Sequence, residues 1–262
     1  MTRSSSYSFG QCARIALSMG WSDFSLQYRS TALGMVWVFL KPALKFVVLY
    51  EVFNTLLGTN IRQYPLYLFS GIIFWEHFSV TTSQCVGILL QKQRLIQRIP
   101  FPRIVLMWSV GWTSFIVLGI HMAILLLATL ILGSGISPRI LFVSAAMLQM
   151  TALALGVGMI LAAYSLRYRD IGHAWQIALQ LLFWLTPVFY RPRLLESRID
   201  DLIRYQPLSI LLREVRTLLV YTDRSLDDSL WTIVLVSVFT AVVLACGIGL
   251  YQYRSRYFLH EY

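Results

Sequence analysis

The chain has 262 residues, of which 57% are hydrophobic and 13% are charged, and its formal net charge is +10. Soluble domains carry about 25% charged residues, so this composition excludes an ordinary soluble protein. The apolar stretches are continuous over about 20 residues, as in membrane-spanning helices, and do not alternate as barrel strands do. We therefore expect an all-α integral membrane protein whose basic residues contact lipid headgroups, and we expect no nucleic acid as a partner.

The chain is predicted to form one membrane domain over residues 1–262, because it contains no internal repeat and no low-complexity linker. Residues 1–34 would form an interfacial helix and a loop, and residues 35–253 would form six spans. Two short helices are expected over residues 191–228, between spans five and six.

The N-terminal region is expected to be an amphipathic helix. Phe9, Cys12, Ala16 and Met19 recur at helical spacing, with basic residues nearby. Such a helix lies flat in the membrane interface, with its apolar face toward the acyl chains. A frayed cytosolic tail is the alternative.

Each predicted span is long enough to cross a bilayer core of about 30 Å at about 1.5 Å per residue. An even number of spans places both termini on one side of the membrane. Among the short loops, those after spans two and four carry six basic residues and those on the opposite face carry two, and the termini add five to the first side, which is therefore predicted to be cytoplasmic. The segment between spans five and six carries seven arginines, which are offset by seven acids. The predicted spans are residues 35–57, 64–90, 104–132, 140–166, 171–190 and 230–253.

Charged residues inside the spans are candidates for function, since each is costly in lipid. Lys41 and Lys45 lie one helical turn apart on one face of span one. One interpretation is a cationic pair that holds an anionic headgroup or phosphate; the other is that both side chains snorkel to the headgroups. Glu76 and His77, near the middle of span two, are interpreted either as a proton relay or as a structural hydrogen-bonded pair.

The loop between spans two and three has the pattern of a short amphipathic helix. Arg94 and Arg98 lie four residues apart on one face, and apolar side chains form the neighbouring face. Pro100 then ends the helix. Such a helix suits a membrane subunit that receives force from a soluble partner; the alternative is a loop that binds headgroups. The residues of interest are Gln91, Lys92, Arg94, Leu95, Arg98, Ile99 and Pro100.

The segment between spans five and six is too apolar for a free loop and too short for a span. Leu195 and Ile199 belong to one helical stripe, Leu211 and Val215 belong to another, and Pro207 separates the two. We expect two half-helices that dip into the membrane or pack on its outer rim.

Aromatic residues make up 14% of the chain and cluster in spans two, three and five. Because aromatic faces stack on sugar rings, an aromatic-lined path would suit a glycan; packing in the core is the alternative for each residue. The candidates for this path are Tyr67, Phe74, Trp75, Trp112, Phe183 and Trp184.

Several catalytic and metal-binding motifs are missing from the sequence. It contains no G-x-x-x-x-G-K-[ST], no H-E-x-x-H and no G-x-S-x-G. The three cysteines are far apart, so we expect free thiols, no metal site and no cofactor. The chain is not expected to be an enzyme, and its energy would come from a partner or from an ion gradient.

Five stretches together resemble one family, the membrane subunits of ABC-2-type polysaccharide exporters for O-antigen, capsule and wall teichoic acid. They follow the family's order from one end of the chain to the other. They are Tyr28-Arg29-Ser30 with Leu33-Gly34, Trp37 and Pro42; YPLYLFSGIIFW over 64–75; Pro100-Phe101-Pro102-Arg103; Arg169-Asp170-Ile171; and Thr186-Pro187-Val188-Phe189-Tyr190.

The resemblance implies the transmembrane subunit of an ATP-driven exporter of a lipid-linked polysaccharide, here expected to be O-antigen, in the bacterial inner membrane. Two copies of the chain would form the channel, and two soluble ATP-binding-cassette subunits would drive it. The helix from Gln91 to Pro100 would be the coupling helix, and the loop from Arg29 to Gly34 would admit the lipid-linked end of the glycan.

The same resemblance implies roles for the remaining candidates. The anionic head of the lipid would be drawn to Arg29, Lys41 and Lys45. Gate helices on the outer face would contain Leu195, Ile199, Leu211 and Val215. The rival interpretations are a permease of the same type for a drug or small lipid, a proton-coupled carrier that uses Glu76 and His77, and a scaffold that transports nothing.

Overall fold

The structure is a computed structural model, and it describes residues 8–29, 32–57, 63–98, 101–131, 141–165, 167–168, 170–190, 203, 205–219 and 230–257. All regular elements in these ranges are α-helices, which confirms the expected all-α class. In chain order they are α1 (Phe9–Arg29), α2 (Val36–Leu57), α3 (Tyr64–Gln91), α4 (Gln93–Arg98), α5 (Ile104–Ile131), α6 (Leu141–Ser165), α7 (Ile171–Leu185), α9 (Pro207–Leu219) and α10 (Leu230–Tyr257).

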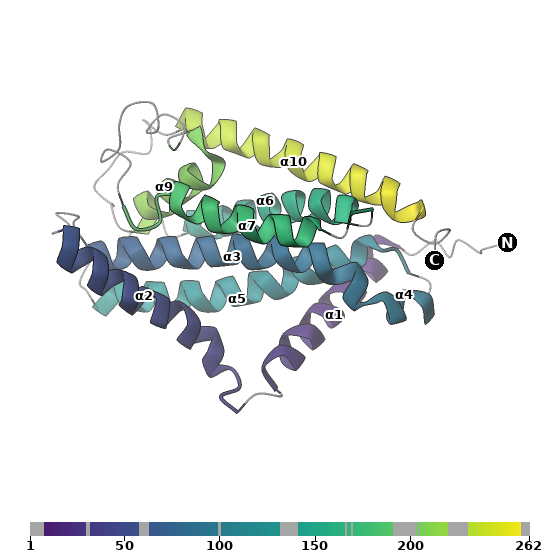
Figure 1. Cartoon of the computed structure of the whole chain (residues 1–262), viewed down its shortest axis with the longest axis horizontal. Coiled ribbons are helices and arrows are strands. Elements are labelled where there is room, and N and C mark those ends of the chain that lie inside the picture. The colour runs from purple at the N-terminus through teal and green to yellow at the C-terminus, as the bar shows by residue number, and fades with distance from the viewer. Residues whose placement is uncertain are drawn as a thin grey trace.

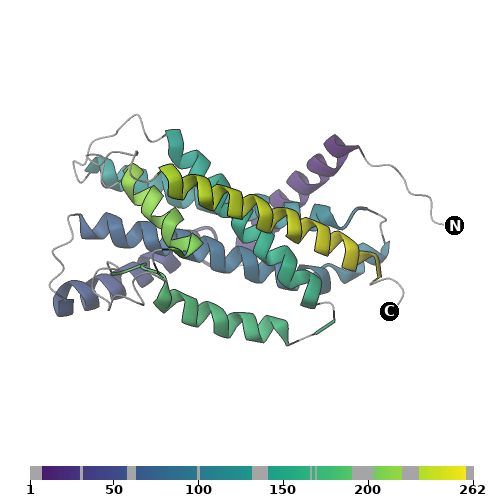
Figure 2. The same ribbon diagram turned by 90° about the horizontal axis from the view of Figure 1, so that it is seen from above.

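The long helices form an elongated bundle (Figure 1). α4, the start of α1 and the end of α10 lie at one end of this bundle, and α9 lies at the opposite end. We call these the α4 end and the α9 end. α1 and α2 form a V on one side of the bundle, and the view from above places α1 and α7 at opposite margins (Figure 2). Gly34 has a φ of 52° in the turn before α2, as expected for a tight turn into that helix.

Three helices of the described part, within α5, α6 and α10, are long and apolar enough to cross a membrane. They coincide with predicted spans three, four and six. α2 and α3 have the predicted extents of spans one and two, but α2 carries Lys41, Lys45 and Glu51, and α3 is rich in hydroxyl groups in its second half. The chain is therefore a multi-pass helical membrane protein in which apolarity supports three of the six predicted spans.

The fifth predicted span is shorter than expected. The prediction extends it to Tyr190, whereas α7 ends at Leu185 after 15 residues. Thr186 is extended, with φ −85° and ψ 132°, because the residue before a proline, here Pro187, is restricted to that region. At about 1.5 Å per residue, α7 is about 22 Å long, which is less than a bilayer core of about 30 Å.

α9 corresponds to the second of the two predicted half-helices. It begins at Pro207, which suits the first helical position because no N–H partner is needed there. Leu211 and Val215 lie on its apolar side and are fully buried. Leu195 and Ile199, predicted for the first half-helix, lie outside the described residues.

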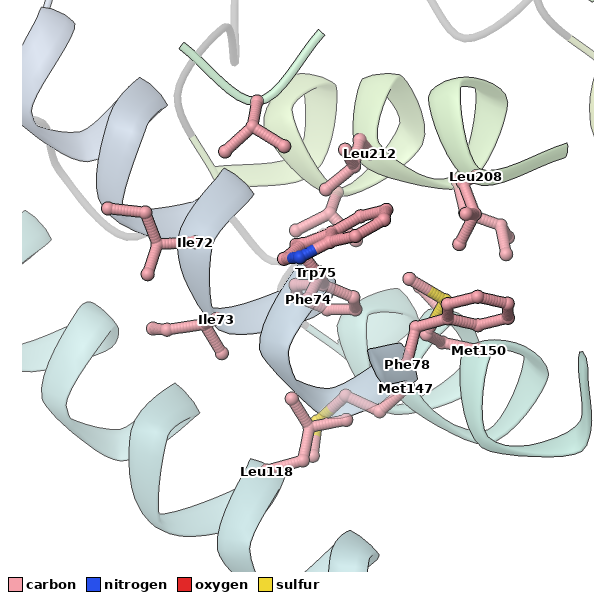
Figure 3. Packing of buried hydrophobic residues seen from close by; sticks show 14 of the residues in the cluster. Ile72, Ile73, Phe74, Trp75, Phe78, Leu118, Met147, Met150, Leu208 and Leu212 are labelled. Carbon is pink, nitrogen blue, oxygen red and sulfur yellow. The ribbon is translucent and has the colours of Figure 1, made fainter. Parts of the chain in front are cut away.

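α3 lies at the centre of the main core, part of which Figure 3 shows. Apolar side chains from α5, α6 and α9 pack on it from several sides, since α3 is apolar around its whole circumference from Leu66 to Trp75. The labelled members of this core are Ile72, Ile73, Phe74, Trp75, Phe78, Leu118, Met147, Met150, Leu208 and Leu212.

Two glycines let α6 approach its neighbours closely. A Cβ atom at Gly156 would lie 2.9 Å from Leu244 Cα on α10, and one at Gly158 would lie 2.7 Å from Cys85 Cβ on α3. Real Cβ atoms do not come this close to other atoms, so both positions require glycine. Small residues at such positions let neighbouring membrane helices pack closely.

Candidate functional site

A cavity with both apolar and polar lining residues lies between α1, α2, α3 and α5, on the side of the bundle where α1 and α2 form the V (Figure 1). Its volume is about 80 Å³. Gln27 and Lys41 are exposed, so the cavity opens to the surface on their side. The polar residues of the lining that matter below are Gln27, Lys41, Glu76, Gln84, Ser114 and His121.

Pro42 shapes this cavity from within α2. Proline has no N–H, so the carbonyl of Val38, four residues earlier, lacks its partner within the helix. His121 on α5 donates a hydrogen bond from Nε2 to this carbonyl over 2.8 Å. The bond supplies the missing partner and ties α2 to α5 at the edge of the cavity.

Glu76 and His77 have different surroundings. His77 Nε2 lies 3.0 Å from Thr151 Oγ1 on α6. The Thr151 hydroxyl also bonds to the Met147 carbonyl within α6, over 2.8 Å. Glu76 Oε2 is buried and has no hydrogen-bond partner in the described part of the chain. The structure therefore bonds His77 to α6, whereas Glu76 has a charge interaction with Lys45 on α2 and keeps one oxygen without a hydrogen bond at the cavity.

Other polar groups of the lining are also unused. Two threonine hydroxyls donate to backbone carbonyls, but Ser114 Oγ is buried without a partner among the described residues. The side chains of Gln27, Gln84 and Lys41 make no hydrogen bond to another described residue. Each of the four helices around the cavity therefore contributes a polar side chain that can still form hydrogen bonds.

The three cations predicted to bind a headgroup face different neighbours. Lys41 lines the cavity. Lys45, one turn later, places its Nζ atom 4.3 Å from the ring centroid of Phe183 on α7, in a cation–π contact. Arg29 is the last residue of α1 and is exposed. Lys41 is thus the one of these three that contributes to the lining.

The predicted amphipathic helix between spans two and three is present as α4 over six residues. Arg94 and Arg98 are exposed, whereas Leu95 and Ile96 are half-buried. Ile96 packs against the apolar cluster at the α4 end, which anchors the helix to the bundle. The two arginines therefore point away from the apolar contacts of α4.

The residues on either side of α4 connect it to the rest of the bundle. Gln91 ends α3 and is exposed. Lys92 Nζ forms an ion pair with Asp23 Oδ1 on α1, and both side chains are about one quarter exposed. This pair joins the start of α4 to α1. Ile99 and Pro100, predicted to complete the helix, lie outside the described residues.

A buried arginine joins three segments at the α9 end. Arg216 of α9 donates to the carbonyls of Pro187 and Val188 over 2.8 Å each and to that of Tyr67 over 3.1 Å. Its Cζ atom lies 3.5 Å from the centroid of the Tyr67 ring. A Cβ atom at Gly71 would lie 2.5 Å from Arg216 Nη2, so glycine makes room for the guanidinium. We call these five residues the arginine clasp.

Three of the aromatic residues predicted for a glycan path form a row. The ring centroids of Trp75 and Phe183 are 5.6 Å apart, and those of Phe183 and Trp184 are 5.7 Å apart. Trp75 is buried in the core, whereas Trp184 is 60% exposed. The row therefore runs from α3 to the outer surface of α7.

The other three predicted aromatic residues lie elsewhere. Tyr67 belongs to the arginine clasp, and Phe74 is fully buried in the core beside α9. Trp112 is 40% exposed on α5 and stacks on Phe115. Within one copy of the chain, the six residues thus do not make a single continuous surface.

Sequence analysis does not predict the arginine clasp or most of the cavity, although both leave a signal. Arg216 lies four residues after Leu212 and three before Leu219, which places it on the apolar stripe of α9. A charge on such a stripe indicates a buried, bonded group. On α3, His77 and Gln84 are seven residues apart, so polar groups recur on one face of an apolar helix.

Fold and site together define a class: a multi-pass helical membrane protein with a partly polar cavity among its helices and a short amphipathic helix at one end. No protein-family model matches the chain. The chain is similar to the O-antigen export system permease protein RfbA of Myxococcus xanthus, with 26% identity over 176 residues, which are 67% of this chain and 68% of that protein.

Two proteins of the same name from Klebsiella pneumoniae are also similar to this chain. They share 22% and 21% identity with it over 217 residues, which are 81% of this chain and 82% of each relative. These relatives confirm the predicted resemblance to the permease subunits of ABC-2-type polysaccharide exporters.

Proposed function

We propose that this chain is the transmembrane subunit of an ATP-driven exporter that moves a lipid-linked O-antigen polysaccharide across the bacterial inner membrane. The observation that carries the proposal is the similarity to three O-antigen export permeases, two of them matched over 81% of this chain. The apolar helices within α5, α6 and α10 support it, since a permease must cross the membrane. On this proposal the chain is a transport component and not an enzyme.

Two copies of the chain would form the channel, and two soluble ATP-binding-cassette subunits would supply the energy. α4 is the proposed coupling helix, because its two arginines are exposed while Ile96 packs against the bundle. The ion pair between Lys92 and Asp23 gives a displacement of α4 a route to α1, which forms one wall of the cavity. Ile99 and Pro100 would complete the coupling helix.

The α4 end is proposed to face the cytoplasm, together with both termini. In support, the start of α1 and the end of α10 lie at this end beside α4 (Figure 1). The six spans would be α2, α3, α5, α6, α7 and α10, with residues 186–190 extending the short fifth span. α9, with Leu211 and Val215, and the preceding segment, with Leu195 and Ile199, would form the outer gate.

The anionic head of the lipid-linked glycan would first meet Arg29 and Lys41. Both are exposed and lie at the end of α1 and near the start of α2, at the point of the V (Figure 1). Lys45 would act deeper, beside Phe183, if it exchanges its ring contact for the headgroup. The row of Trp75, Phe183 and Trp184 would then offer faces on which sugar rings stack.

Deletion of the reading frame for this chain tests the proposed function. We expect loss of surface O-antigen on lipopolysaccharide gels and accumulation of lipid-linked glycan in membrane extracts, both reversed by the wild-type chain. A deletion strain that keeps its surface polysaccharide and accumulates no glycan would contradict the proposal and favour a drug or small-lipid permease. Export that persists without an ATPase, and that loses its pH dependence in Glu76→Gln, would favour a proton-coupled carrier.

Reversal of the charges on α4 tests the coupling role. The double variant Arg94→Glu with Arg98→Glu should lower surface polymer and glycan-stimulated ATP hydrolysis by roughly tenfold or more. The two arginines would meet an acidic surface of the ATPase partner, and glutamates at the same positions would repel that surface. The matched double variant with lysine at both positions keeps the charge and should keep most activity. Equal membrane levels of all three proteins are required, and normal export by the glutamate variant would remove the coupling role.

A further inference from the structure

The lining of the cavity is partly apolar and includes several polar side chains whose hydrogen bonds are unmade. Glu76 Oε2 and Ser114 Oγ are buried and unpartnered in the described part of the chain, and such groups destabilise a fold unless something else satisfies them. Gln27 and Gln84 add two amides that bond to no other described residue. Four polar side chains from α1, α3 and α5 therefore surround one cavity with bonding capacity to spare.

The chemistry of these groups favours a ligand with several hydroxyls. A carboxylate accepts hydrogen bonds, whereas amide and hydroxyl groups both donate and accept them. An apolar ligand would leave all of them unpaired, and the described residues contain no cluster of three or more metal ligands. Trp37 also lines the cavity, and its indole provides an aromatic surface for the apolar face of a sugar ring.

The volume of the cavity and the charge of Lys41 restrict the possible ligands further. A cavity of about 80 Å³ holds about six water molecules, at roughly 10–15 Å³ each on this measure. That space suits one sugar ring and not an oligosaccharide. Lys41 lies at the exposed rim of the cavity, where its ammonium group would pair with a phosphate attached to that ring.

We propose that the cavity binds the first sugar of the lipid-linked glycan, the one that carries the phosphate. Lys41 would bind the phosphate, and Glu76, Gln84 and Ser114 would bind the hydroxyls. This inference rests on the proposed function and names the part of the substrate that is recognised. The chain would read the sugar next to the lipid and accept any polymer attached to it.

Binding to the full chain in lipid nanodiscs, measured by native mass spectrometry, tests the inference. The probes are short polyprenyl diphosphates that carry one glucose, galactose, N-acetylglucosamine or N-acetylgalactosamine, the same lipid without a sugar, and the four free sugar phosphates. The wild type should bind its preferred sugar-bearing lipid about tenfold more tightly than the bare lipid, as expected for one or two well-placed hydrogen bonds.

Variants of the lining separate the two parts of the ligand. In Gln84→Ala and Glu76→Gln, the ratio of the affinity for the sugar-bearing lipid to the affinity for the bare lipid should fall toward one. The affinity for the bare lipid itself should not change. Lys41→Ala should weaken both lipids by a similar factor. Glu51→Gln is the matched control, because Glu51 is an exposed acid on α2 outside the lining, and it should change neither affinity.

Thermal unfolding distinguishes a binding role from a structural one. Glu76→Gln should leave the melting temperature nearly unchanged, because the Oε2 atom of Glu76 has no hydrogen bond to lose; a lower melting temperature with an intact sugar preference would overturn the inference. If the variants change the proportion of dimers and not the sugar preference, the cavity is a contact site for a second copy of the chain. That result would also overturn the inference.

The remaining outcomes separate this inference from the proposed function. If the wild type binds none of the lipids, the proposed function fails and the inference fails with it. If it binds the lipids without any sugar preference, or if the preference survives Gln84→Ala and Glu76→Gln, the inference alone is wrong. Free sugar phosphates that bind as tightly as their lipids would contradict the lipid-linked assignment.

Discussion

The arginine clasp and the cavity both contain polar groups inside an apolar bundle, but they use hydrogen bonds differently. In the clasp, Arg216 donates to three backbone carbonyls and fixes α9 to α3 and to the segment after α7. In the cavity, Glu76 Oε2 and Ser114 Oγ have no partner in the described part of the chain. A buried polar group that is bonded within the chain holds structure, whereas one that is left unbonded beside a cavity is available to a ligand.

Loss of the clasp is the change with the largest expected effect on stability. Arg216→Ala removes three hydrogen bonds from a buried guanidinium to backbone carbonyls, together with its contact on the Tyr67 ring, so we expect a loss of about 3–5 kcal/mol in the free energy of unfolding. Arg213→Ala is the control, because Arg213 is half-buried on the same helix and its bond to Thr232 is long, at 3.4 Å. Thermal unfolding of both variants in nanodiscs measures the difference, and equal melting temperatures would refute the clasp.

The clasp can also be disturbed without touching its arginine. In Gly71→Ala the added Cβ atom would lie 2.5 Å from Arg216 Nη2 and 2.6 Å from the Val188 carbonyl oxygen. We expect a loss of about 1–3 kcal/mol, the usual result of overpacking. Gly119→Ala on α5 is the control, since nothing lies within 4 Å of its added Cβ atom, and it should stabilise the protein by up to about 1 kcal/mol. If Gly71→Ala leaves the free energy of unfolding unchanged, the Arg216 guanidinium is not confined beside residue 71.

Glu214 lies on α9 beside the clasp, but unlike Arg216 it has a buried polar atom that is not bonded. Its Oε2 atom is buried without a partner among the described residues, and burial raises the pKa of this carboxyl above its ordinary value of 4.5. The neutral form is therefore favoured in the folded state, so stability falls as the pH rises through the raised pKa. Glu214→Gln should raise the melting temperature at neutral pH and not at pH 4. A gain that is the same at both values would exclude titration of this group as the cause.

The ion pair between Lys92 and Asp23 should contribute little to stability. Its side chains are partly exposed, and pairs of this kind contribute about 0.2–1 kcal/mol. A double-mutant cycle with Lys92→Ala and Asp23→Ala measures the coupling energy. If the pair transmits motion from α4, both single variants should lower export more than they lower stability, and exchanging the two charges should restore it. Full export by both single variants would exclude that role.

The smallest expected effect on stability lies at the cavity. Ser114→Ala removes an unpartnered hydroxyl, so the free energy of unfolding should change by no more than about 0.5 kcal/mol. Ser109→Ala on the same helix is the comparison, because the Ser109 hydroxyl donates to the Leu106 carbonyl, and its loss should cost about 1 kcal/mol. A larger loss from Ser114→Ala than from Ser109→Ala would mean that the cavity hydroxyl holds structure after all.

The positions of most helices could be predicted from the sequence, because each follows from an uninterrupted apolar run with clear limits. α3 begins at Tyr64 and α5 at Ile104, as predicted. In the fifth predicted span the apolar composition continues to Tyr190, but the helix ends at Leu185 because Pro187 restricts the backbone of the residue before it. Composition therefore predicts the extent of an apolar segment, whereas local backbone restrictions determine where the helix within it ends.

The candidate site could be predicted only in part. Arg94 and Arg98 follow from spacing alone, since one short helix determines their exposure. The cavity depends on how four helices meet, and no local pattern states which polar faces adjoin. Lys41 and Lys45 show the limit: the sequence places them one turn apart, yet Lys41 lines the cavity and Lys45 lies on the ring of Phe183.

ATP-dependent transport in proteoliposomes tests the central claim most directly. A lipid-linked glycan is supplied on the outer face, and its protection from an external glycan-binding lectin is measured over time. The account predicts protection only when the chain, an ATP-binding-cassette partner and ATP are all present, and predicts little protection with the double variant Arg94→Glu and Arg98→Glu. Equal protection by the chain alone, or by a proton gradient without ATP, would contradict it.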